Sequence, residues 1–420
     1  MKVLFLNSSD TSGGAAIAAK RLMNALIDSG IDVNLLVLDK NSENKNVFSV
    51  KTSFVIQKLA LLYFLWERFI IFIINRLSRK NLFKISIANV GFDVSGHKLV
   101  KEADIIHLHW INQGFLSLKS LKKIFALRKP IVWTMHDMWG FTGICHYAGN
   151  CSNYTKECGN CHFLKKPKIN DKSAMLFHKK KKLFANAPLF VVTCSDWLCE
   201  VAKQSELLQN QLIMSIPNPI DIEQFKPCNQ IEARQRLKLP HDKKLLLFGA
   251  ANISDSRKGI TLLINALQLL ANNREKHDIE LVVFGKTSEL LVDKMPLPVH
   301  IFNYISNSEM IVDFYNAADV FVLPSLEDNL PNTVMEALSC GLPVVAFQIG
   351  GVPEMITHAI NGYLASEINE KELAKGIEYI IDNENIQQFR INARNKVETT
   401  YQPRIIAKQY ESLYNKILKK

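Results

Sequence analysis

The sequence predicts an α/β protein built from two doubly wound parallel sheets in tandem. Short apolar runs rich in β-branched residues alternate with segments of helical periodicity along the whole chain, which is the pattern of successive β–α–β units. These runs form two separate series, and 420 residues are enough for two domains. An apolar fraction of 48% with 22% charged residues is typical of globular proteins and unlike disordered or fibrous ones.

The predicted strands fall into one series in each half of the chain. The first series is KVLFLNSS, DVNLLVLD, DIIHLHW, PIVWTMH and LFVVTCS, with a helix expected over AAIAAKRLMNALIDSG. The second series is KLLLFGAAN, IELVVFG, VHIFNYI, DVFVLPS and PVVAFQI. Because parallel strands are joined by crossover helices, each series predicts one sheet.

The boundary between the two sheets is expected near residues 216–221, where two prolines interrupt the pattern. Apolar residues recur at helical spacing from Tyr401 to Leu418, which predicts a closing helix that packs back across the joint. The predicted organisation is a first domain over 1–216, a second domain over 217–398, and a helix over 399–420 that packs on the first domain.

The opening residues MKVLFLNSSD lack the long apolar region and the cleavage site of a signal peptide, so a first strand is expected there. The most lipophilic stretch, Leu59–Ile74, is interrupted by Glu67 and Arg68 and falls short of an uninterrupted membrane span. We therefore expect a protein that stays in the cytoplasm.

Basic residues favour anionic partners, and the net charge is +11. The four lysines at 179–182 fit a solvated helix face as well as a membrane contact. Residues 59–77 mix aromatic and aliphatic side chains, and basic residues lie within and beside them. Such a segment can lie in a membrane interface, where it would bring the chain to a lipid-linked partner. A buried helix of the first domain fits equally well.

Two glycine-containing turns are candidate phosphate sites. Gly13 and Gly14 lie between the first strand and a helix, where backbone amides and the helix dipole can meet an anion. The sequence is not GxGxxG, and a tight turn that needs glycine explains it equally well. The tripeptide Gly285–Lys286–Thr287 resembles the end of a P-loop, but Glu280 occupies the position of the required first glycine, so we reject that site.

Three histidines follow or end predicted strands of the first domain. His107 and His109 share one strand face, and His136, followed by Asp137, ends the next strand. Ligands of open α/β sheets bind beyond the carboxyl ends of strands, which places His109 and His136 at the expected cleft. We expect His107, one layer deeper, to be a hydrogen-bonded core residue.

Four of the eight cysteines lie within the single loop 145–161. In a reducing cytoplasm this clustering favours a structural zinc site or a reactive site over disulfides. The first spacing is wider than that of a usual zinc knuckle, so buried thiols that simply pack the loop explain the pattern nearly as well. Oxidative pairing ranks third. The four residues are Cys145, Cys151, Cys158 and Cys161.

The second half contains a loop with two adjacent cations. The segment from Gly249 to Gly259 leaves a predicted strand, contains Arg257 and Lys258, and leads into the apolar helix ITLLINALQLL. Two fixed positive charges in a strand-to-helix loop are suited to a diphosphate leaving group, whose negative charge develops as a glycosidic bond breaks. Ordinary surface basic residues are the alternative, and the loop position with its following glycine favours function.

A short helix is predicted after the strand DVFVLPS. Pro331 suits its first turn, and Gly341 followed by Pro343 ends it, so its N-terminus can receive an anion. An apolar stripe of Val334, Ala337 and Leu338 leaves Glu336 off the stripe and able to point into a cleft. A carboxylate there can accept hydrogen bonds from the hydroxyls of a ribose or a sugar.

Taken together, these motifs resemble the family 4 retaining nucleotide-sugar glycosyltransferases of the GT-B architecture. The resemblance covers essentially the whole chain, and its most specific parts are RKG, EDNLPNTVMEALSCGLPVV and the Gly350–Glu354 segment. The segments HLHWIN, WTMHDMWGFTGICHY and the cysteine loop resemble the branch that serves capsular, colanic-acid-type and O-antigen polysaccharide assembly in bacteria.

The resemblance implies a role for each matching position. It implies two Rossmann-like domains with a cleft between them, the first binding the acceptor and the second the nucleotide-sugar. Glu336 matches the acid that binds the ribose, Asp328 the acid that touches the donor sugar, and Lys258 the lysine on the diphosphate. His136 matches the histidine near the donor sugar, and Gly13 and Gly14 match the glycine loop.

Two positions depart from the family pattern. The first acid is Asp328 where the family has Glu, with Glu327 beside it, and Ala250 stands where the family often has arginine; Arg257 is the candidate replacement for that charge. The expected catalytic residues are His136, Arg257, Lys258 and Asp328. The expected donor contacts are Glu336, Glu327, Asn329, Leu330, Pro331, Gly13, Gly14 and Gly249, and the expected acceptor or cleft residues are His109, Asp137, Gly350 and Gly351.

The implied reaction moves a sugar from a UDP- or GDP-sugar to a lipid-linked saccharide with retention of configuration. It requires no cofactor, and no nucleic acid is involved. A nucleotide-sugar epimerase, a phosphorylase and a non-catalytic sugar-binding or membrane scaffold protein are the alternatives. A phosphorylase would have a recognisable cofactor-binding lysine, which this sequence does not show. The retention of Lys258, Asp328 and Glu336 argues against a silent scaffold.

Overall fold

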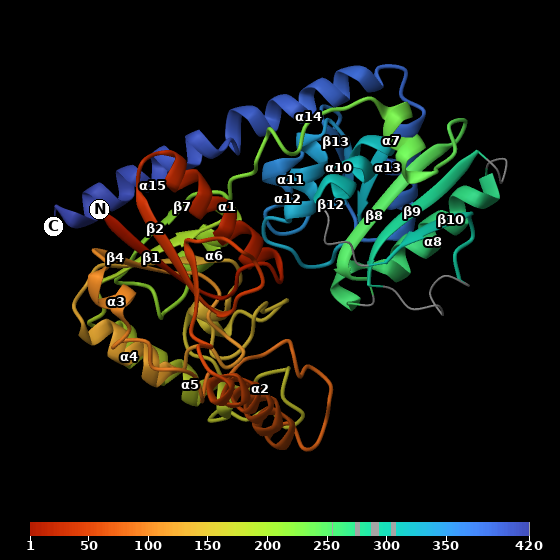
Figure 1. Cartoon of the computed structure of the whole chain (residues 1–420). Coiled ribbons are helices and arrows are strands. Elements are labelled where there is room, and N and C mark those ends of the chain that lie inside the picture. Colours follow the sequence, from red (N-terminus) through yellow and green to blue (C-terminus); the bar gives the residue numbers. More distant parts are fainter. Residues whose placement is uncertain (254, 274–277, 287–293, 304–307, 420) are drawn as a thin grey trace. The chain divides into compact units, whose positions relative to one another are not determined.

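The computed structural model describes residues 1–253, 255–273, 278–286, 294–303 and 308–419. The chain divides into two compact units, one formed by Met1–Asn218 with Ile406–Lys420 and the other by Pro219–Ile405. Each unit contains one parallel sheet covered by helices (Figure 1). The predicted fold class, two doubly wound parallel α/β sheets, is therefore confirmed.

The sheet of the first unit has seven strands in the order β3-β2-β1-β4-β5-β6-β7, and every pair of neighbours is parallel. The strands are β1 (Lys2–Ser9), β2 (Asp32–Asp39), β3 (Val47–Ser49), β4 (Ile105–Leu108), β5 (Ile131–Met135), β6 (Leu189–Thr193) and β7 (Leu212–Ser215). The helices are α1 (Gly14–Asp28), α2 (Phe54–Ile74), α3 (Lys98–Glu102), α4 (Leu118–Ala126), α5 (Lys172–Phe184), α6 (Asp196–Lys203) and most of α15 (Pro403–Leu418).

The sheet of the second unit has six strands in the order β10-β9-β8-β11-β12-β13, again all parallel. The strands are β8 (Lys244–Asn252), β9 (Ile279–Lys286), β10 (Val299–Phe302), β11 (Val320–Leu323), β12 (Val344–Phe347) and β13 (Gly362–Ala365). The helices are α7 (Gln230–Leu237), α8 (Ile260–Asn273), α10 (Ser308–Ala317), α11 (Asn332–Ser339), α12 (Val352–Met355), α13 (Glu370–Ile381) and α14 (Ile386–Thr400). The strands β3, β7 and β13 are absent from the sequence prediction.

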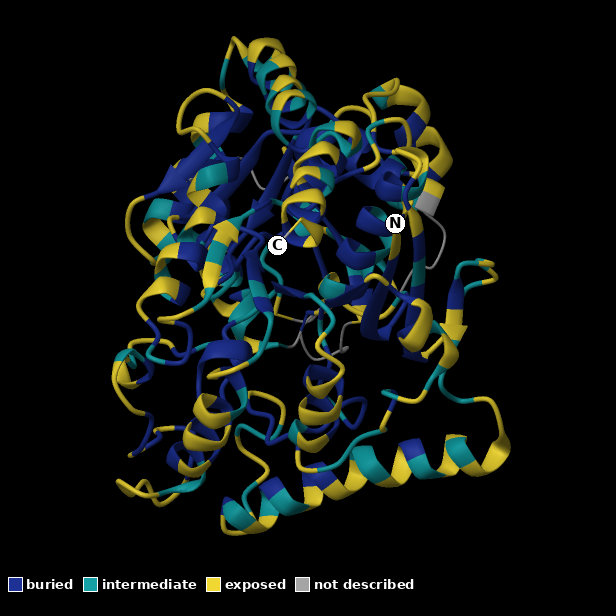
Figure 2. Cartoon of the chain, turned by 90° about the vertical axis from the view of Figure 1, so that its left-hand side faces the viewer, coloured by how far each residue is buried: buried dark blue, intermediate teal, exposed yellow. Residues whose placement is uncertain are grey.

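Alternation along the strands of the first unit divides its core into two layers. In β1, Leu4 and Leu6 belong to the apolar cluster on one face of the sheet, and Val3 and Phe5 belong to the cluster on the other. Successive strand residues point to opposite faces, which explains this division. Figure 2 shows the buried strands between partly exposed helices.

Helix α15 completes the second of these two layers. Its apolar stripe, which includes Ile406, Tyr410 and Tyr414, packs in the same cluster as residues of α1 and β2. The Tyr414 hydroxyl lies 2.7 Å from Nδ1 of His107, and the Tyr410 hydroxyl lies 2.9 Å from Oγ1 of Thr134. These contacts join the closing helix to the centre of the first sheet.

Replacing Tyr414 with phenylalanine should lower the free energy of unfolding by about 1–3 kcal/mol, because Nδ1 of the buried His107 would lose its partner. The matched control is Tyr379→Phe, since Tyr379 is 41% exposed and its substitution should have little effect. Denaturant unfolding of the two variants measures the difference. Equal stabilities would show that the α15 contact contributes nothing.

Candidate active site

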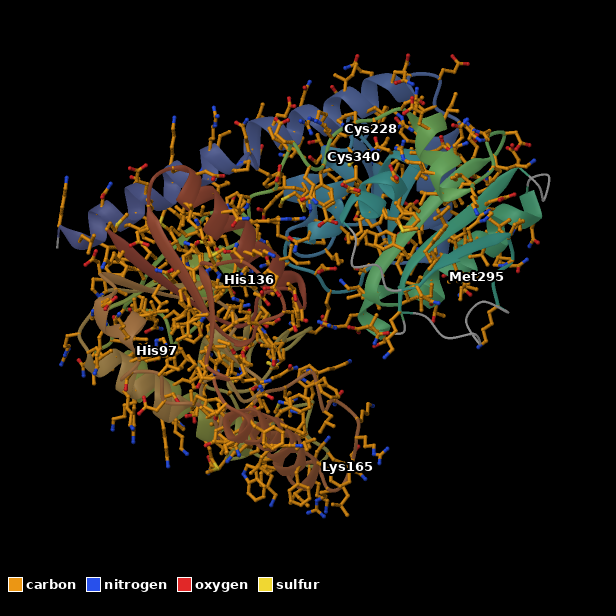
Figure 3. All side chains as sticks on the ribbon, viewed as in Figure 1. His97, His136, Lys165, Cys228, Met295 and Cys340 are labelled. Atoms are coloured by element: carbon orange, nitrogen blue, oxygen red, sulfur yellow. The ribbon has the colours of Figure 1, made fainter. Side chains whose placement is uncertain are left out.

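The first group of site residues is a row of three side chains that follow β4, β5 and β6. Nδ1 of His109 lies 3.2 Å from Nε2 of His136, and Nδ1 of His136 lies 3.3 Å from Sγ of Cys194. Because β4, β5 and β6 are adjacent parallel strands, their carboxyl ends lie at one edge of the sheet. The structure therefore brings the predicted His109 and His136 together inside the first unit. Figure 3 labels His136.

Both histidines of this row are neutral near pH 7. Burial lowers the pKa of His136 to about 4 and lowers the pKa of His109 well below its usual value. Nε2 of His109 is buried and has no hydrogen-bond partner among the described residues, so we assign the proton of His109 to Nδ1. His109 then donates to His136, and Nδ1 of His136 carries the proton that faces Cys194.

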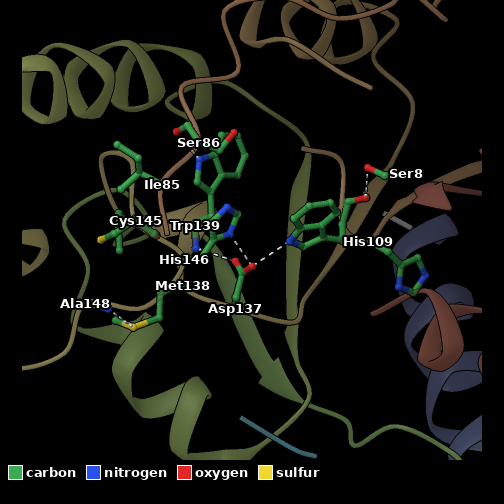
Figure 4. A network of polar contacts seen from close by, with 12 residues as sticks. Ser8, Ile85, Ser86, His109, Asp137, Met138, Trp139, Cys145, His146 and Ala148 are labelled. Carbon is green, nitrogen blue, oxygen red and sulfur yellow. Dashed lines mark hydrogen bonds and ion pairs between the residues drawn. The ribbon is translucent and has the colours of Figure 1, made fainter. Parts of the chain in front are cut away.

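Asp137 is held by three donors from the surrounding loops (Figure 4). Its Oδ2 accepts from the Trp110 indole at 2.9 Å and lies 2.7 Å from Nδ1 of His146, while Oδ1 accepts from the Trp139 amide at 2.8 Å. Burial alone would raise the pKa of Asp137, but His146 and these hydrogen bonds outweigh it and lower the pKa. Asp137 is therefore an ionised carboxylate whose hydrogen bonds hold the loop, and its predicted role toward the acceptor stays a prediction.

His107 is a core residue, as expected. Its side chain is fully buried, and its two ring nitrogens each lie 2.7 Å from a hydroxyl, those of Tyr414 and Thr134. Three of the four lysines at 179–182 are exposed, as expected for a solvated helix face, but Lys180 departs from that expectation because it is 1% exposed. It donates to the carbonyls of Trp139 and Thr142 and lies 3.6 Å from the centre of the Trp139 ring. Burial lowers its pKa to about 7.

Gly13 has a structural reason for being glycine. Its φ is +91°, and it precedes the first residue of α1, Gly14, with no side-chain cap. L-residues rarely adopt this backbone conformation, and the uncapped N-terminus is compatible with a bound anion. The predicted role of both glycines in donor binding stays a prediction.

The second group of site residues lies in the second unit, around the loop after β8. Nζ of Lys258 and Oδ2 of Asp328 form an ion pair at 2.7 Å. Arg257 donates from two of its guanidinium nitrogens, Nε and Nη2, to Asp255, at 3.3 and 2.7 Å. The predicted catalytic residues Lys258 and Asp328 are thus in direct contact, whereas Arg257 forms an ion pair with Asp255. Ser254 of the same loop lies outside the described residues, as does Thr287 of the rejected P-loop candidate.

Gly259 allows the cationic loop to contact the end of β11. Its φ is +68°, and a Cβ atom there would lie 1.8 Å from the carbonyl oxygen of Pro324. The amide of Leu326 also donates to the carbonyl of Arg257 at 2.7 Å. This close backbone approach places the loop of Lys258 beside the residues that lead to α11.

The expected position of Glu336, off the buried stripe of α11, is wrong. The carboxylate does not stand off the buried stripe, because the residue is only 7% exposed. Its Oε2 accepts from the Tyr315 hydroxyl at 2.8 Å. Apolar spacing alone identified the stripe, but a carboxylate can share a buried face when a neighbouring helix supplies a donor. Its predicted role toward the ribose stays a prediction.

The remaining predicted donor residues surround the start of α11. No side chain caps this helix, whose N-cap residue is Pro331, so its N-terminus is suited to an anion. The amide of Gly351 donates to the carbonyl of Asn329 at 2.9 Å, which joins the two predicted loops. The residues involved are Glu327, Asn329, Leu330, Pro331, Gly350 and Gly351. Gly249 has a packing role, since a Cβ there would lie 2.1 Å from the Phe284 ring.

Two residues of these groups were missed from the sequence. Cys194 contacts His136, and Tyr315 contacts Glu336. Cys194 lies near the end of the predicted strand LFVVTCS, a signal that could have placed it in the row with His136. A separate cavity of the second unit, lined in part by Cys228, Cys340 and Arg390, contains none of the predicted site residues. Figure 3 labels Cys228 and Cys340.

The four cysteines of the loop line one small cavity together with His162. All four are free thiols, and the amide of Gly143 donates to Sγ of Cys158 at 3.2 Å. Among the described residues, no three His, Cys, Asp or Glu side chains are arranged to hold a metal ion. The structural zinc at Cys145, Cys151, Cys158 and Cys161 therefore stays a prediction, which elemental analysis of the purified chain tests.

The sequence also matches known protein families over both units. Residues 229–396 match the family described as Glycosyl transferases group 1. Residues 12–224, just over half of the chain, match Glycosyltransferase Family 4. The chain belongs to glycosyltransferase family 4.

Three relatives place this family 4 glycosyltransferase among other transferases. It is 25% identical over 361 residues to an uncharacterized glycosyltransferase of Methanocaldococcus jannaschii, covering 80% of this chain and 90% of the relative. It is 25% identical to the capsular polysaccharide biosynthesis glycosyltransferase CapM of Staphylococcus aureus, over 48% of this chain and 54% of CapM. A third match, at 32% identity, covers 28% of this chain and 31% of the N,N'-diacetylbacillosaminyl-diphospho-undecaprenol alpha-1,3-N-acetylgalactosaminyltransferase of Campylobacter jejuni.

Solved structures support the fold of this family 4 enzyme. Sucrose-phosphate synthase from Thermosynechococcus elongatus superimposes with a TM-score of 0.68 at 18% identity, over 99% of each chain. HepE of Anabaena, solved in complex with UDP, superimposes with a TM-score of 0.64 at 18% identity, over 99% of this chain and 100% of HepE. The expected GT-B architecture is confirmed.

Acidification from pH 6.5 towards pH 5 should destabilise the protein. Burial lowers the pKa values of His107, His109 and His136 in the folded state, so between those lowered values and about 6.5 the unfolded chain binds more protons. Stability then falls by up to about 1.4 kcal/mol per pH unit for each proton. His107→Gln should reduce the slope in denaturant unfolding measured across this range, and an unchanged slope would exclude His107 as a contributor.

The thiols should differ sharply in reactivity. Cys228 is the one exposed cysteine among the eight, all of which are described, and burial raises the pKa of Cys158 to about 12 and of Cys161 to about 11. Because the thiolate is the reactive form, a chromogenic disulfide reagent should label Cys228 first and the buried thiols only after unfolding. Cys228→Ser should abolish the fast phase, and rapid labelling of Cys158 would contradict the burial described here.

Proposed function

We propose that this glycosyltransferase transfers a sugar from a UDP- or GDP-sugar to a lipid-linked saccharide, with retention of anomeric configuration. The observation that carries the proposal is the contact between Lys258 and Asp328 at 2.7 Å, beside the loop that leads to α11. The structure of HepE with UDP supports the donor class. The name of the Campylobacter jejuni relative includes a diphospho-undecaprenol acceptor, which supports the acceptor class. CapM supports a place in capsular polysaccharide assembly.

The diphosphate of the donor would be bound in the second unit. In the absence of donor, Lys258 is neutralised by Asp328 and Arg257 by Asp255. A diphosphate can replace the Asp328 contact of Lys258 and accept from the amides at the start of α11. Asp328, released from the lysine, would then be available to accept from a donor-sugar hydroxyl, and Glu336 would bind the ribose.

The reaction would proceed by attack of the acceptor hydroxyl on the face that the diphosphate leaves. The bond between the anomeric carbon and the diphosphate oxygen breaks as the new glycosidic bond forms, and the leaving phosphate accepts the proton of the acceptor. Lys258 and the helix N-terminus stabilise the developing charge, so no divalent metal is required in this scheme. His136, held neutral, would add no positive charge. A hydrogen bond from His136 to the donor sugar would replace its present contact with His109 or with Cys194.

Replacing Lys258 with alanine should lower kcat by about 100-fold or more, because a preorganised charge on the leaving group would be lost. Nucleotide release from a panel of UDP- and GDP-sugars, with lipid-linked acceptor, measures the effect. The matched control is Lys294→Ala, an exposed lysine of the same unit. Near-normal turnover of the Lys258 variant would overturn its assignment.

Glu336→Gln should raise KM for the donor more than it lowers kcat, since the ribose contact is made in both ground and transition states. The same panel separates the alternatives. Release that requires the acceptor supports transfer, and donor isomerisation without acceptor would identify an epimerase. Activity that persists in the presence of a chelator would support the metal-independent scheme, and its loss would contradict that scheme.

We also propose that the enzyme works at the cytoplasmic face of a membrane, where a lipid-linked acceptor would lie. No helix in the described part of the chain is long and apolar enough to cross a bilayer.

A further inference from the structure

Helix α2 exposes its apolar side chains and buries its charged ones. The buried residues of this 21-residue helix are Ala60, Glu67, Arg68 and Ile71. Surface helices of globular proteins normally show the opposite arrangement. In Figure 2 the helix runs along the lower edge of the view with much of its length exposed. Its outer face consists of Phe54, Val55, Leu61, Leu62, Leu65, Trp66, Phe69 and Ile73, which are 46–73% exposed.

The buried charges explain why the helix keeps this orientation. Oε1 of Glu67 accepts from the Ser86 hydroxyl at 2.6 Å and from the amides of Ile87 and Ala88 at 2.8 and 2.9 Å. Oε2 of Glu67 pairs with Arg68 at 2.9 Å, and Arg68 also donates to the carbonyl of Leu82 at 2.5 Å. Turning the apolar face inward would leave these donors and acceptors without their partners, at a large cost in free energy.

Within the segment 53–84, which contains α2, the exposed charges all have one sign. Glu67 is the one acidic residue of the segment 53–84, and it is buried. The exposed charged residues of that segment are Lys58, Arg76, Arg79, Lys80 and Lys84. A protein surface that binds another protein usually carries mixed charges, whereas a uniformly basic rim around aromatic and aliphatic side chains matches an anionic lipid surface.

A second segment adds charge to the end of the same helix. The amide of Lys165 donates to Oδ1 of Asn75 at 2.6 Å, and the Asn81 side chain donates to the carbonyl of Phe163 at 3.1 Å. These bonds hold the loop after Phe163 against the end of α2, where Figure 3 shows Lys165. Lys165, Lys166 and Lys168 are all exposed.

We infer that the outer face of α2 lies in the interface of an anionic membrane, with its apolar side chains at the acyl boundary and its basic rim on the lipid phosphates. Trp66 and the phenylalanines are side chains favoured at that depth. The inference rests on the proposed function for its purpose, because this contact brings the acceptor-binding unit to a lipid-linked acceptor. The contact itself is independent of catalysis.

The test is sedimentation of the full chain with vesicles of phosphatidylglycerol and phosphatidylcholine, against vesicles of phosphatidylcholine alone. Binding should be at least about tenfold stronger to the anionic vesicles, because several basic side chains contact the surface, and it should weaken as salt is added. Equal or absent binding to both kinds of vesicle would overturn the inference.

Two sets of variants identify the surface. Leu65→Glu with Trp66→Glu should abolish vesicle binding, and Arg79→Glu with Lys80→Glu should remove the preference for anionic lipid. The matched control is Ile391→Glu, because Ile391 is an apolar residue of α14 that is 52% exposed. This variant should bind vesicles as the unmodified chain does. Unchanged thermal unfolding shows that the exposed substitutions leave the fold intact.

Two further measurements separate the possible failures. Light scattering without lipid detects a dimer that the Leu65 and Trp66 substitutions disrupt; such a dimer would assign the face to a second copy and overturn the membrane inference. Nucleotide release with a short-chain, detergent-dispersed acceptor reports the transferase alone. Loss of vesicle binding with retained release supports both proposals, and vesicle binding without release from any donor contradicts only the proposed function.

Discussion

The carboxylate of Asp137 is the interaction around which the loops of the first unit are arranged. A buried charge is stable only when donors surround it, and Asp137 receives them from Trp110 after β4, from Trp139 after β5 and from His146 in the cysteine loop. The same requirement appears at Lys180, which donates to the carbonyls of two residues in this region. These contacts fix the segment that carries His136, so its position depends on polar groups several loops apart.

In the second unit, the loops that carry the predicted site residues are joined mainly by contacts between backbone atoms. Gly259 lets the chain pass close to the carbonyl of Pro324, and Gly351 donates to the carbonyl of Asn329. Three loops are thereby joined without help from long side chains. The ion pair of Lys258 with Asp328 also joins two of these loops, and a charge held in place before the reaction is what an electrostatic catalyst requires.

The sequence predicts the fold well because strand and helix periodicities are local properties. The alternation of apolar runs and helical segments was sufficient to predict two parallel sheets. The turn residues also predicted the loop that ends at Gly259 and the helix α11. Strand β3 was missed because its three residues carry little periodic signal. Strand β13, GYLA, contains one aromatic and no β-branched residue, whereas predicted strands of the same length, such as VFVL and VVAF, are rich in such residues.

The candidate site is predicted less completely, because its contacts join residues far apart in the chain. Glu336 and Lys180 were expected at or near solvent, since spacing rules count apolar residues and cannot see the donor or acceptor that a distant element supplies. The Tyr315 hydroxyl and the Trp139 carbonyl are such partners. Cys194 was overlooked for the same reason: its contact with His136 spans 58 positions.

In α2, different side chains hold the helix in place and form its exposed face. This separation affects how the sequence of the enzyme can change during evolution. The residues that hold the helix in place, Glu67 and Arg68, face inward and bond to the segment 82–88. The side chains that face outward contribute little to folding, so mutations there are nearly free of a stability penalty. Selection could therefore remodel that surface for a different bilayer composition while the sugar-transferring machinery stays unchanged.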